Sequence, residues 1–439
     1  MKIFFICPTR EWLRIKSKND KPKGTFFLRL PSLAAATIAA LTPKEFEFRV
    51  VDEQIDYLDI NEPVDLIAIT CNTATARRAY EIAELYKKKG VPVVLGGIHP
   101  SLNPSEACKH GTVVIGPAEP VWQPLLDDFK QNNLKKIYHS SLSNSSLVKP
   151  DRTVYNGKKY LTTDLVETSR GCIHHCNFCS TASAFNGRFI KKSVSEVIGE
   201  IKSLNSKFIF FVDDNLIGDA AHAKALFRAL IPLKIKWISQ VTYLFGLDDD
   251  LLHLANKSGC MGVFIGFESI SDETLRKHNK SFGKVELYKK AIRNIHKNGI
   301  LIQGSFIFGS DAETGNIFEN TLKFVERNKI DGVFFGVYTP LPSTPVYQAM
   351  NSNRRIINAN YDYYDYRHCV FEPRNMSPQE LEDGVNVLIR KYFMINKVIT
   401  RFFRTLVTLI KNKSLLLFLG YYIAFLSRNK MLRKPYTES

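Results

Sequence analysis

The chain has 439 residues, 45% of them hydrophobic and 23% charged, a composition typical of a folded protein with two or three domains. Its formal charge of +17 favours a negatively charged partner, such as a nucleic acid, an anionic membrane or a phosphorylated substrate. However, residues 397–439 hold nine Lys and Arg residues and only one acid, Glu438. Because nearly half of the excess charge lies in this tail, the basic charge does not imply a nucleic-acid enzyme for the whole chain, and we expect no nucleic-acid partner.

Three of the eight cysteines lie within the stretch GCIHHCNFCS (171–180). The first residues, MKIFFICPTREW, lack the charged leader, long apolar run and cleavage site of a secretory signal. Clustered thiols without an export signal predict a cytoplasmic protein whose cysteines bind metal rather than form disulfides.

Residues 1–138 alternate apolar runs with helical stretches. Strands are predicted within 2–7, 47–56, 65–71 and 92–100, helices within 30–41 and 76–90, and one more strand and helix within 112–129. This alternation predicts a doubly wound, Rossmann-like α/β domain, which binds ligands at the carboxyl ends of its strands. Those ends carry Thr70 to Thr73, the stretch GGIHP (96–100) and the stretch GPAEP (116–120).

A polar stretch begins at residue 139, and we assign 139–160 as a linker to a second domain at 161–350. Strands are predicted within 164–169, 208–213, 236–241, 262–267, 302–308 and 332–338, with helices such as 193–204 and 221–231 between them. Six such units predict a partial (β/α)6 barrel, similar to part of a TIM barrel, with the active site at the carboxyl ends of the strands. The residues suited to chemistry follow those ends: Cys172, Cys176, Cys179, Asp213, Asp214, Glu268 and Gly309.

Residues 351–439 form a small aromatic and helical region with a basic tail. A helix over 377–395 is predicted from the capping pair Ser377 and Glu380, with Pro378 in the first turn. Apolar segments follow at 398–411 and 414–427, and the second is shorter than the roughly 18–20 residues that a spanning helix needs. We favour a packed helical pair, and the alternative is a basic surface that contacts the anionic inner face of a membrane.

The three clustered cysteines have the spacing Cys-x3-Cys-x2-Cys, at Cys172, Cys176 and Cys179. A four-iron cluster needs one ligand for each iron, so three cysteines leave one iron open to chelate a small molecule. A structural zinc site that adds His174 or His175 is the alternative, and such a site has no free position.

The cysteine motif resembles that of the radical S-adenosylmethionine superfamily, in which the cofactor binds the open iron of a [4Fe–4S] cluster. The resemblance implies that Phe178, before the last cysteine, lies against the adenine. Similar stretches follow in order, with implied cofactor contacts at Asp213, Asp214 and Asn215 (FIFFVDDN), Glu268 (GVFIGFES) and Gly309 (GSFIFGSD). Strand-end capping explains each acid singly, whereas the ordered series favours a cofactor site.

The amino-terminal pattern resembles the cobalamin-binding domain of cobalamin-dependent radical enzymes. The implied cobalamin contacts are Thr70, Thr73, Gly96, Gly97, His99, Gly116 and Glu119. No histidine has an aspartate two residues before it, so the resemblance implies cobalamin without a histidine lower ligand. In addition, the stretch GPAE keeps only Glu119 of the family's Gly-Glu-x-Glu turn. In the rival family, the methylthiotransferases, a second cluster would use Cys7, Cys71 and Cys108, which we predict to be core residues instead.

The resemblance implies an enzyme that methylates an unactivated carbon of a small-molecule or lipid-like substrate through a 5′-deoxyadenosyl radical and methylcobalamin. It also implies a cellular electron donor of the flavodoxin or ferredoxin type. The first alternative is a cobalamin-containing radical cyclase or rearrangement enzyme, and a non-catalytic metal- or cobalamin-binding module is the second. The residues do not identify the substrate or a catalytic side chain.

Overall fold

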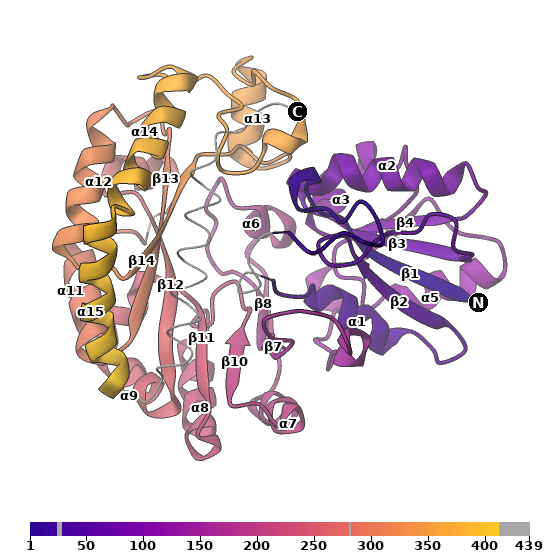
Figure 1. Ribbon diagram of the computed structural model, residues 1–439, viewed down its shortest axis with the longest axis horizontal. Helices are drawn as coiled ribbons and strands as arrows, with labels where there is room; N and C mark the ends of the chain where they lie inside the picture. Colours follow the sequence, from indigo (N-terminus) through magenta and orange to yellow (C-terminus); the bar gives the residue numbers. More distant parts are fainter. Residues whose placement is uncertain (24–28, 281, 412–439) are drawn as a thin grey trace.

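The computed structural model describes residues 1–23, 29–280 and 282–411, so the apolar segment 414–427 and the end of the basic tail lie outside the described residues. Figure 1 shows two α/β units side by side, an amino-terminal sheet with helices on both faces and a larger curved sheet with helices on its outside. The predicted combination of a Rossmann-like domain, a partial barrel and a small carboxyl-terminal helical region is confirmed.

The amino-terminal sheet is parallel, in the strand order β2-β1-β3-β4-β5-β6. Its strands are β1 (Lys2–Cys7), β2 (Glu47–Asp52), β3 (Leu66–Thr70), β4 (Val93–Gly96), β5 (Thr112–Ile115) and β6 (Ile137–His139). The helices are α1 (Leu33–Leu41), α2 (Ala76–Lys87), α3 (Ile98–Leu102), α4 (Pro104–Ala107) and α5 (Trp122–Lys130). Helices α1 and α5 pack on one face of the sheet, and α2 and α4 pack on the other. The strands are therefore apolar on both sides, as parallel sheets require.

The stretch predicted as a linker packs against this domain. Tyr155 and Tyr160 belong to the core between the sheet and α1, and the Tyr160 hydroxyl donates to Asp52 over 2.8 Å. The backbone N–H of Asp151 donates to the carbonyl of Ala36 in α1 over 2.9 Å. The stretch also contacts the second domain, because Arg152 forms an ion pair with Glu200 over 2.5 Å. Its role as a linker stays a prediction.

The second sheet is also parallel, in the order β14-β13-β12-β11-β10-β7, and β14 does not pair with β7, which leaves a partial barrel. Its strands are β7 (Leu165–Val166), β10 (Phe208–Phe211), β11 (Lys236–Val241), β12 (Cys260–Glu268), β13 (Leu301–Phe308) and β14 (Gly332–Val337). The intervening helices are α6 (Ser180–Phe185), α7 (Val194–Leu204), α8 (Ala220–Leu230), α9 (Asp249–Ser258), α10 (Asp272–Lys277), α11 (Val285–Lys297) and α12 (Asn316–Arg327). A short antiparallel pair, β8 (Ser169–Gly171) and β9 (Phe189–Lys191), flanks the cysteine motif.

Side chains alternate between the two faces of this sheet. Trp237 packs on Phe227 of α8, Phe267 on Tyr288 of α11 and Phe335 on Tyr392, so these strand residues face the helices. Their neighbours along each strand therefore face the inside of the barrel: Phe210, Ile238, Gln240, Phe264, Gln303, Ser305 and Phe334. Gln240, although it lies on a central strand, is exposed, so the inner face is open at this level.

The carboxyl-terminal region adds α13 (Pro345–Ser352), α14 (Pro378–Tyr392) and α15 (Ile395–Lys411). Helix α14 begins with the predicted capping box, in which Ser377 and Glu380 satisfy each other's backbone N–H groups. Figure 1 shows α14 and α15 on the outside of the barrel, while the segment around α13 reaches towards the amino-terminal domain. No helix among the described residues is long and apolar enough to cross a membrane.

Candidate active site

The cysteine loop is fastened to the end of β10 by Asp214. Its carboxylate accepts hydrogen bonds from the backbone N–H of Gly171 and from the hydroxyl of Thr181, both over 3.0 Å, so it holds the residues on either side of the motif. Gly171 has a φ of +89°, and an added Cβ would lie 2.1 Å from the carbonyl oxygen of Arg188 on the partner strand. Only glycine fits here, immediately before Cys172.

The three thiols lie close enough to influence one another electrostatically. Burial raises the pKa of all three, to about 12 for Cys176. Backbone N–H groups point at two of the sulfurs, from His174 to Cys172 and from Thr181 and Ala182 to Cys179. Such donors stabilise thiolates, and metal binding offsets the cost of deprotonating a buried thiol. These features fit a cluster held by thiolates.

The two histidines of the motif have other contacts. The His174 ring stacks on Phe282 with the centroids 3.8 Å apart, and burial lowers its pKa to about 4. The His175 ring lies against Gly187. Within the described residues, no three His, Cys, Asp or Glu side chains surround a point that would hold one metal ion. Ligands of a four-iron cluster bind separate irons and need not converge on one point.

Glu268 and a cation that the sequence did not indicate lie beside the cysteines. Glu268 ends β12 at a register shift, with a φ of +64°, and its carboxylate pairs with Lys280 over 3.0 Å. The Lys280 ammonium also donates to the carbonyl of Gly266 over 2.7 Å, and its charge lowers the pKa of the Cys176 thiol against the larger effect of burial. A buried cation next to thiolates stabilises their negative charge. Lys280 lies in no motif, so only the fold reveals it.

Asp213 and Asn215, on either side of Asp214, differ in their surroundings. The Asp213 carboxylate is buried and accepts from the backbone and hydroxyl of Thr168 and from the hydroxyl of Ser169. These hydrogen bonds cap the strand end, and burial raises the pKa of Asp213 to about 6. The predicted contact of Asp213 with S-adenosylmethionine stays a prediction. Asn215 is 3% exposed, and its Oδ1 has no hydrogen-bond partner among the described residues. A buried acceptor without a donor fits a polar ligand that donates to it.

A second buried polar atom without a hydrogen-bond partner among the described residues lies near Phe178. The Phe178 ring packs edge-on against His278 and Tyr338, with centroids 5.3 and 6.1 Å apart. His278 is 2% exposed, burial lowers its pKa to about 3, and its Nε2 has no partner in the described part of the chain. Together with Asn215, this neutral imidazole supports a polar, ring-containing ligand such as S-adenosylmethionine at the end of the barrel strands.

Gly309 is explained by packing alone. It has a φ of +112°, and an added Cβ would lie 2.6 Å from Leu381 of α14 and 3.1 Å from Phe371. Its N–H donates to Glu313 over 3.0 Å, and the same carboxylate accepts from Ser269 beside Glu268. That the backbone at Gly309 approaches the adenine stays a prediction.

A cavity of about 310 Å³ lies between the amino-terminal sheet and α1, at the carboxyl ends of the strands. Five of the predicted cobalamin residues line it: Thr70, Gly96, Gly97, Gly116 and Glu119. An added Cβ at Gly97 or Gly116 would lie within 2.7 Å of a backbone carbonyl oxygen. The inner wall is apolar, with Phe5, Ala68 and Val94. A slot that opens at a glycine-rich edge fits cobalamin, which has a large ring and a long tail.

Two predicted cobalamin residues do not line this cavity. His99 is buried, and its ring nitrogens lie 3.2 Å from the Thr73 hydroxyl and 3.1 Å from the Tyr80 hydroxyl. Both Thr73 and His99 therefore take part in a buried polar network on the other side of the sheet edge. Similarly, Cys7, Cys71 and Cys108 lie apart in the two cores of the domain, as predicted for core residues.

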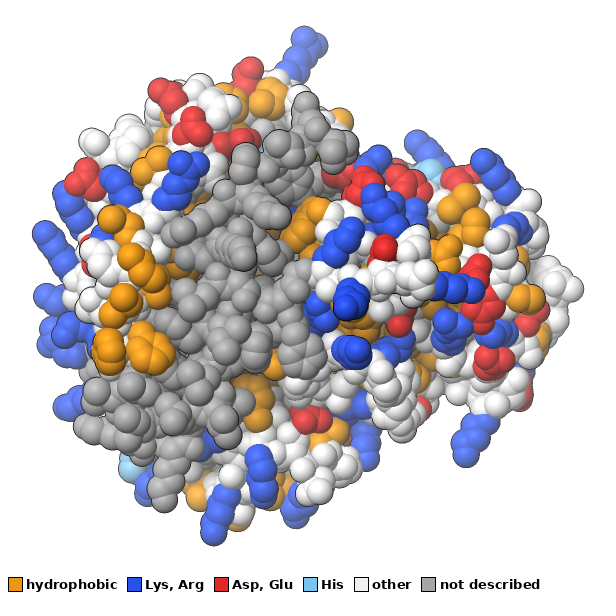
Figure 2. All heavy atoms as spheres, viewed as in Figure 1, with side chains coloured by type: hydrophobic (Ala, Val, Ile, Leu, Met, Phe, Trp, Pro, Cys, Tyr) orange, Lys and Arg blue, Asp and Glu red, His pale blue; other side chains and the backbone are white. Residues whose placement is uncertain are grey.

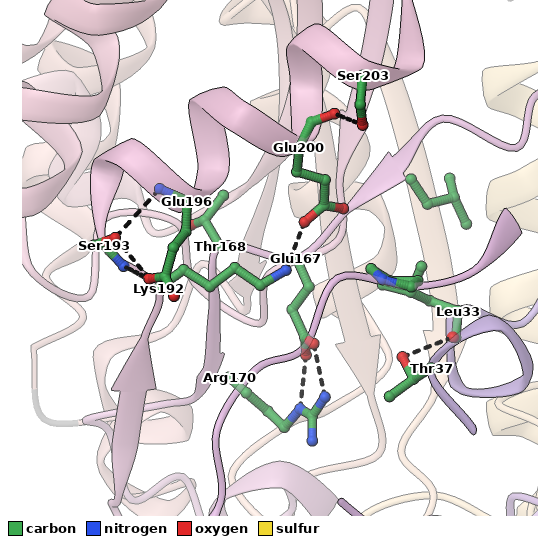
Figure 3. A network of polar contacts seen from close by, with 12 residues as sticks. Leu33, Thr37, Glu167, Thr168, Arg170, Lys192, Ser193, Glu196, Glu200 and Ser203 are labelled. Atoms are coloured by element: carbon green, nitrogen blue, oxygen red, sulfur yellow. Dashed lines mark hydrogen bonds and ion pairs between the residues drawn. The ribbon is translucent and has the colours of Figure 1, made fainter. Parts of the chain in front are cut away.

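The barrel supplies the remaining wall of the cavity through Glu167, Arg170, Ala184 and Phe185. Arg170, two residues before Cys172, makes a double hydrogen bond to Glu167 and an ion pair of 2.8 Å with Glu119 of the other domain. Figure 3 shows the Glu167–Arg170 pair beside Leu33 and Thr37 of α1. Arg170 was missed from the sequence because its partner lies 51 residues away. It connects the cysteine loop to the cobalamin cavity.

Comparison with known proteins supports both halves of this site. Residues 166–325 match the Radical SAM superfamily, and residues 24–125 match the B12 binding domain. The chain is 31% identical to bacteriochlorophyllide d C-8(2)-methyltransferase of Chlorobaculum tepidum, over 82% of this chain and 83% of the relative. It belongs to the cobalamin-dependent radical S-adenosylmethionine methyltransferase family. Its cofactors are therefore a [4Fe–4S] cluster, S-adenosylmethionine and cobalamin.

Two further relatives agree with this assignment. Bacteriochlorophyllide d C-12(1)-methyltransferase of the same organism is 28% identical over 89% of each chain. The solved structure of TsrM from Kitasatospora setae, a radical S-adenosylmethionine methyltransferase with cobalamin and a [4Fe–4S] cluster bound, matches with a TM-score of 0.62. That match covers 80% of this chain and 78% of TsrM at 19% identity, which supports the fold.

Proposed function

We propose that this methyltransferase acts on an unactivated carbon of a flat, largely apolar acceptor of the tetrapyrrole type. The observation that carries this proposal is the aromatic inner face of the barrel. Phe210, Phe264 and Phe334 come from three different strands and are only half-buried, and Gln240 beside them is exposed. A flat apolar ligand that covers partly exposed aromatic rings removes apolar surface from water, which favours binding. The relatives named for bacteriochlorophyllide support the same class within the broader range of small-molecule or lipid-like acceptors.

The chain's own residues hold and orient the reacting groups. Cys172, Cys176 and Cys179 would hold the cluster, while Asp214 fixes the loop that carries them. Asn215 and Glu268 would bind S-adenosylmethionine at the ends of β10 and β12. When bound, these cofactors supply a radical that breaks a C–H bond and a methyl group for the resulting carbon radical. The residues that line the cavity from the barrel, above all Arg170, would hold cobalamin beside the loop that carries the cysteines.

Two partners belong to this proposal. Reduction of the cluster needs an electron donor, which we propose to be a flavodoxin or ferredoxin. We also propose peripheral contact with an anionic membrane through α15, because Ile395, Ile399 and Phe403 form a stripe at helical spacing and are 48–69% exposed. Figure 2 shows an apolar patch where α15 lies.

Methyl transfer to a tetrapyrrole tests the proposal directly. Enzyme reconstituted without oxygen with iron, sulfide and cobalamin is mixed with bacteriochlorophyllide d, a reductant and S-adenosylmethionine that carries a deuterated methyl group. We expect mass spectrometry to detect a labelled methyl group on the tetrapyrrole carbon skeleton. Release of 5′-deoxyadenosine with a changed but unmethylated tetrapyrrole would favour the cyclase or rearrangement alternative.

The matched variants are Cys176→Ala and Cys260→Ala. Cys176→Ala removes a cluster ligand and should abolish both cluster binding and cleavage of S-adenosylmethionine. Cys260 is buried at the start of β12, away from the motif, so Cys260→Ala should keep the iron content. Retained cleavage in Cys176→Ala would contradict the assigned ligand.

A further inference from the structure

The segment 361–368 of the carboxyl-terminal region is clamped against the amino-terminal domain. The Tyr361 hydroxyl donates to Glu106 over 2.8 Å, and Asp362 forms an ion pair with Arg77. Asp365, which is buried, pairs with Arg10 over 3.3 Å. These contacts hold the segment across the junction between the cobalamin domain and the barrel, the region where the two cofactors must cooperate.

Tyr366 follows this clamp in a strained backbone conformation. Its φ is +63°, a left-handed value that is uncommon for a bulky side chain. Hydrogen bonds on both sides fix this conformation. The N–H of Val337 at the end of β14 donates to the Tyr366 carbonyl over 2.8 Å. The N–H of Arg367 donates to the Asp365 carboxylate over 2.9 Å. Strain of this kind persists where the surrounding structure imposes it, often at functional sites.

The Tyr366 ring faces the candidate active site. It lies edge-on to Phe334 of the barrel's inner face, with the ring centroids 6.4 Å apart. The ring is 39% exposed, yet enough protein surrounds it to raise its pKa to about 12, and the nearby charges of Cys179 and Glu268 add to this rise. The Tyr366 side chain therefore packs against Phe334 with one part of its surface and is open to solvent with another. Its hydroxyl has no partner among the described residues, and the high pKa keeps it a hydrogen-bond donor at neutral pH.

We propose that Tyr366 is a specificity-determining residue that contacts the acceptor between the cluster and the cobalamin cavity. The position follows from Phe334 on the inner face of the barrel, against which the Tyr366 ring packs, and from the hydrogen bond that ties the Tyr366 carbonyl to the end of β14. The ring extends the aromatic surface of the barrel, and the hydroxyl offers one hydrogen bond to a polar group on an otherwise apolar acceptor. The inference rests on the proposed function and names the residue that recognises its acceptor.

The test compares Tyr366→Gly and Tyr366→Phe with Tyr363→Phe. Tyr363 lies on the same segment but packs against His368, with the ring centroids 5.0 Å apart. Glycine adopts a positive φ without strain, so the relieved strain in Tyr366→Gly offsets part of the packing that is lost with the ring, and thermal unfolding of the variant checks that it folds.

Binding of bacteriochlorophyllide d to the reconstituted enzyme, followed by its fluorescence, is the first readout. We expect Tyr366→Gly to raise the Kd roughly tenfold and Tyr366→Phe to raise it roughly two- to fivefold, as for loss of a buried aromatic anchor and of one hydrogen bond. Tyr363→Phe should bind like the wild type. Iron content should stay within about twofold of the wild type in both Tyr366 variants, because Tyr366 is not a ligand of the cluster.

The second readout does not depend on the acceptor. Fluorotyrosine placed at position 366 should show a resolved ¹⁹F coupling to the reduced cluster in electron–nuclear double resonance, and at position 363 it should not. Without the coupling at position 366, the proposal for Tyr366 fails, whatever the acceptor. With the coupling but no tetrapyrrole binding by the wild type, the proposed acceptor class fails, while the placement of Tyr366 stands. Unchanged binding by Tyr366→Gly would overturn the specificity role.

Discussion

At the scale of single residues, Glu313 joins the ends of β12 and β13 beneath the proposed cofactor site. One oxygen accepts from Ser269, and the other accepts from the N–H groups of Gly309 and Ser310. The side chain is 2% exposed, and burial raises its pKa from 4.5 to about 7 despite these donors. A carboxyl group with a raised pKa keeps its proton in the folded protein after the unfolded chain has lost it.

This makes folding stability depend on pH, with a definite sign. The stabilising contribution of Glu313 is fully present below pH 4.5 and is lost as pH rises through about 7, an effect of about 3 kcal/mol from the shift in pKa. Glu313→Gln keeps the shape and does not ionise, so its free energy of unfolding relative to the wild type should rise by about 2–3 kcal/mol between pH 5 and pH 8. Urea unfolding at both pH values measures this difference. Equal differences at the two pH values would show that Glu313 ionises as freely as in the unfolded chain.

At the scale of elements, α15 is an amphipathic helix whose apolar stripe of Ile395, Ile399 and Phe403 is exposed among the described residues. Buried Val398 and the aliphatic part of Arg401 pack towards the barrel, while Ile395, Ile399 and Phe403 point outward. If this stripe enters a membrane surface, Phe403→Glu should reduce binding to phosphatidylglycerol vesicles roughly tenfold or more, because it replaces an aromatic side chain that would enter the lipid with an anion.

The matched control for that prediction is Val387→Glu on the neighbouring helix α14, where the valine is 44% exposed and lies outside the stripe. Cosedimentation with phosphatidylglycerol and phosphatidylcholine vesicles measures binding for both variants. If the wild type binds neither kind of vesicle, the membrane proposal fails, and α15 only packs on the barrel, as the sequence analysis favoured.

Elements were predictable from the sequence where a local pattern decides them. The capping box at Ser377 and Glu380, the alternation of strands with helices and the cysteine spacing are all local, and the corresponding elements form. The polar composition of residues 139–160 did not indicate that two tyrosines pack this stretch against the first domain, and its assignment as a linker stays a prediction. The sequence did not predict Lys280 and Arg170 as site residues, because their ion-pair partners are brought close only by the tertiary fold.

At the scale of the whole molecule, the two cofactor domains meet through few charged contacts, of which Arg170–Glu119 is the most central. Arg170 is 18% exposed and Glu119 is 5% exposed, and the pair lines the cobalamin cavity directly beside the cysteine loop. Glu167 holds the same guanidinium from within the barrel. The ion pair therefore ties the loop 116–119 to the strand that precedes the cysteine motif.

Loss of this contact should weaken the binding of cobalamin without changing the binding of the cluster. Glu119→Gln removes the charge that ties the loop to Arg170, and we expect it to weaken cobalamin binding roughly tenfold, corresponding to about 1.4 kcal/mol for a partly buried pair that keeps one partner. Iron content should not change, because Glu167 still orients Arg170 before Cys172. The control Glu84→Gln breaks a surface contact with Lys87 and His110 in the same domain and should leave both cofactors bound. Cobalt and iron analysis of the purified variants measures both quantities, and a parallel loss of iron in Glu119→Gln would mean that the interface supports the cluster as well as the cobalamin.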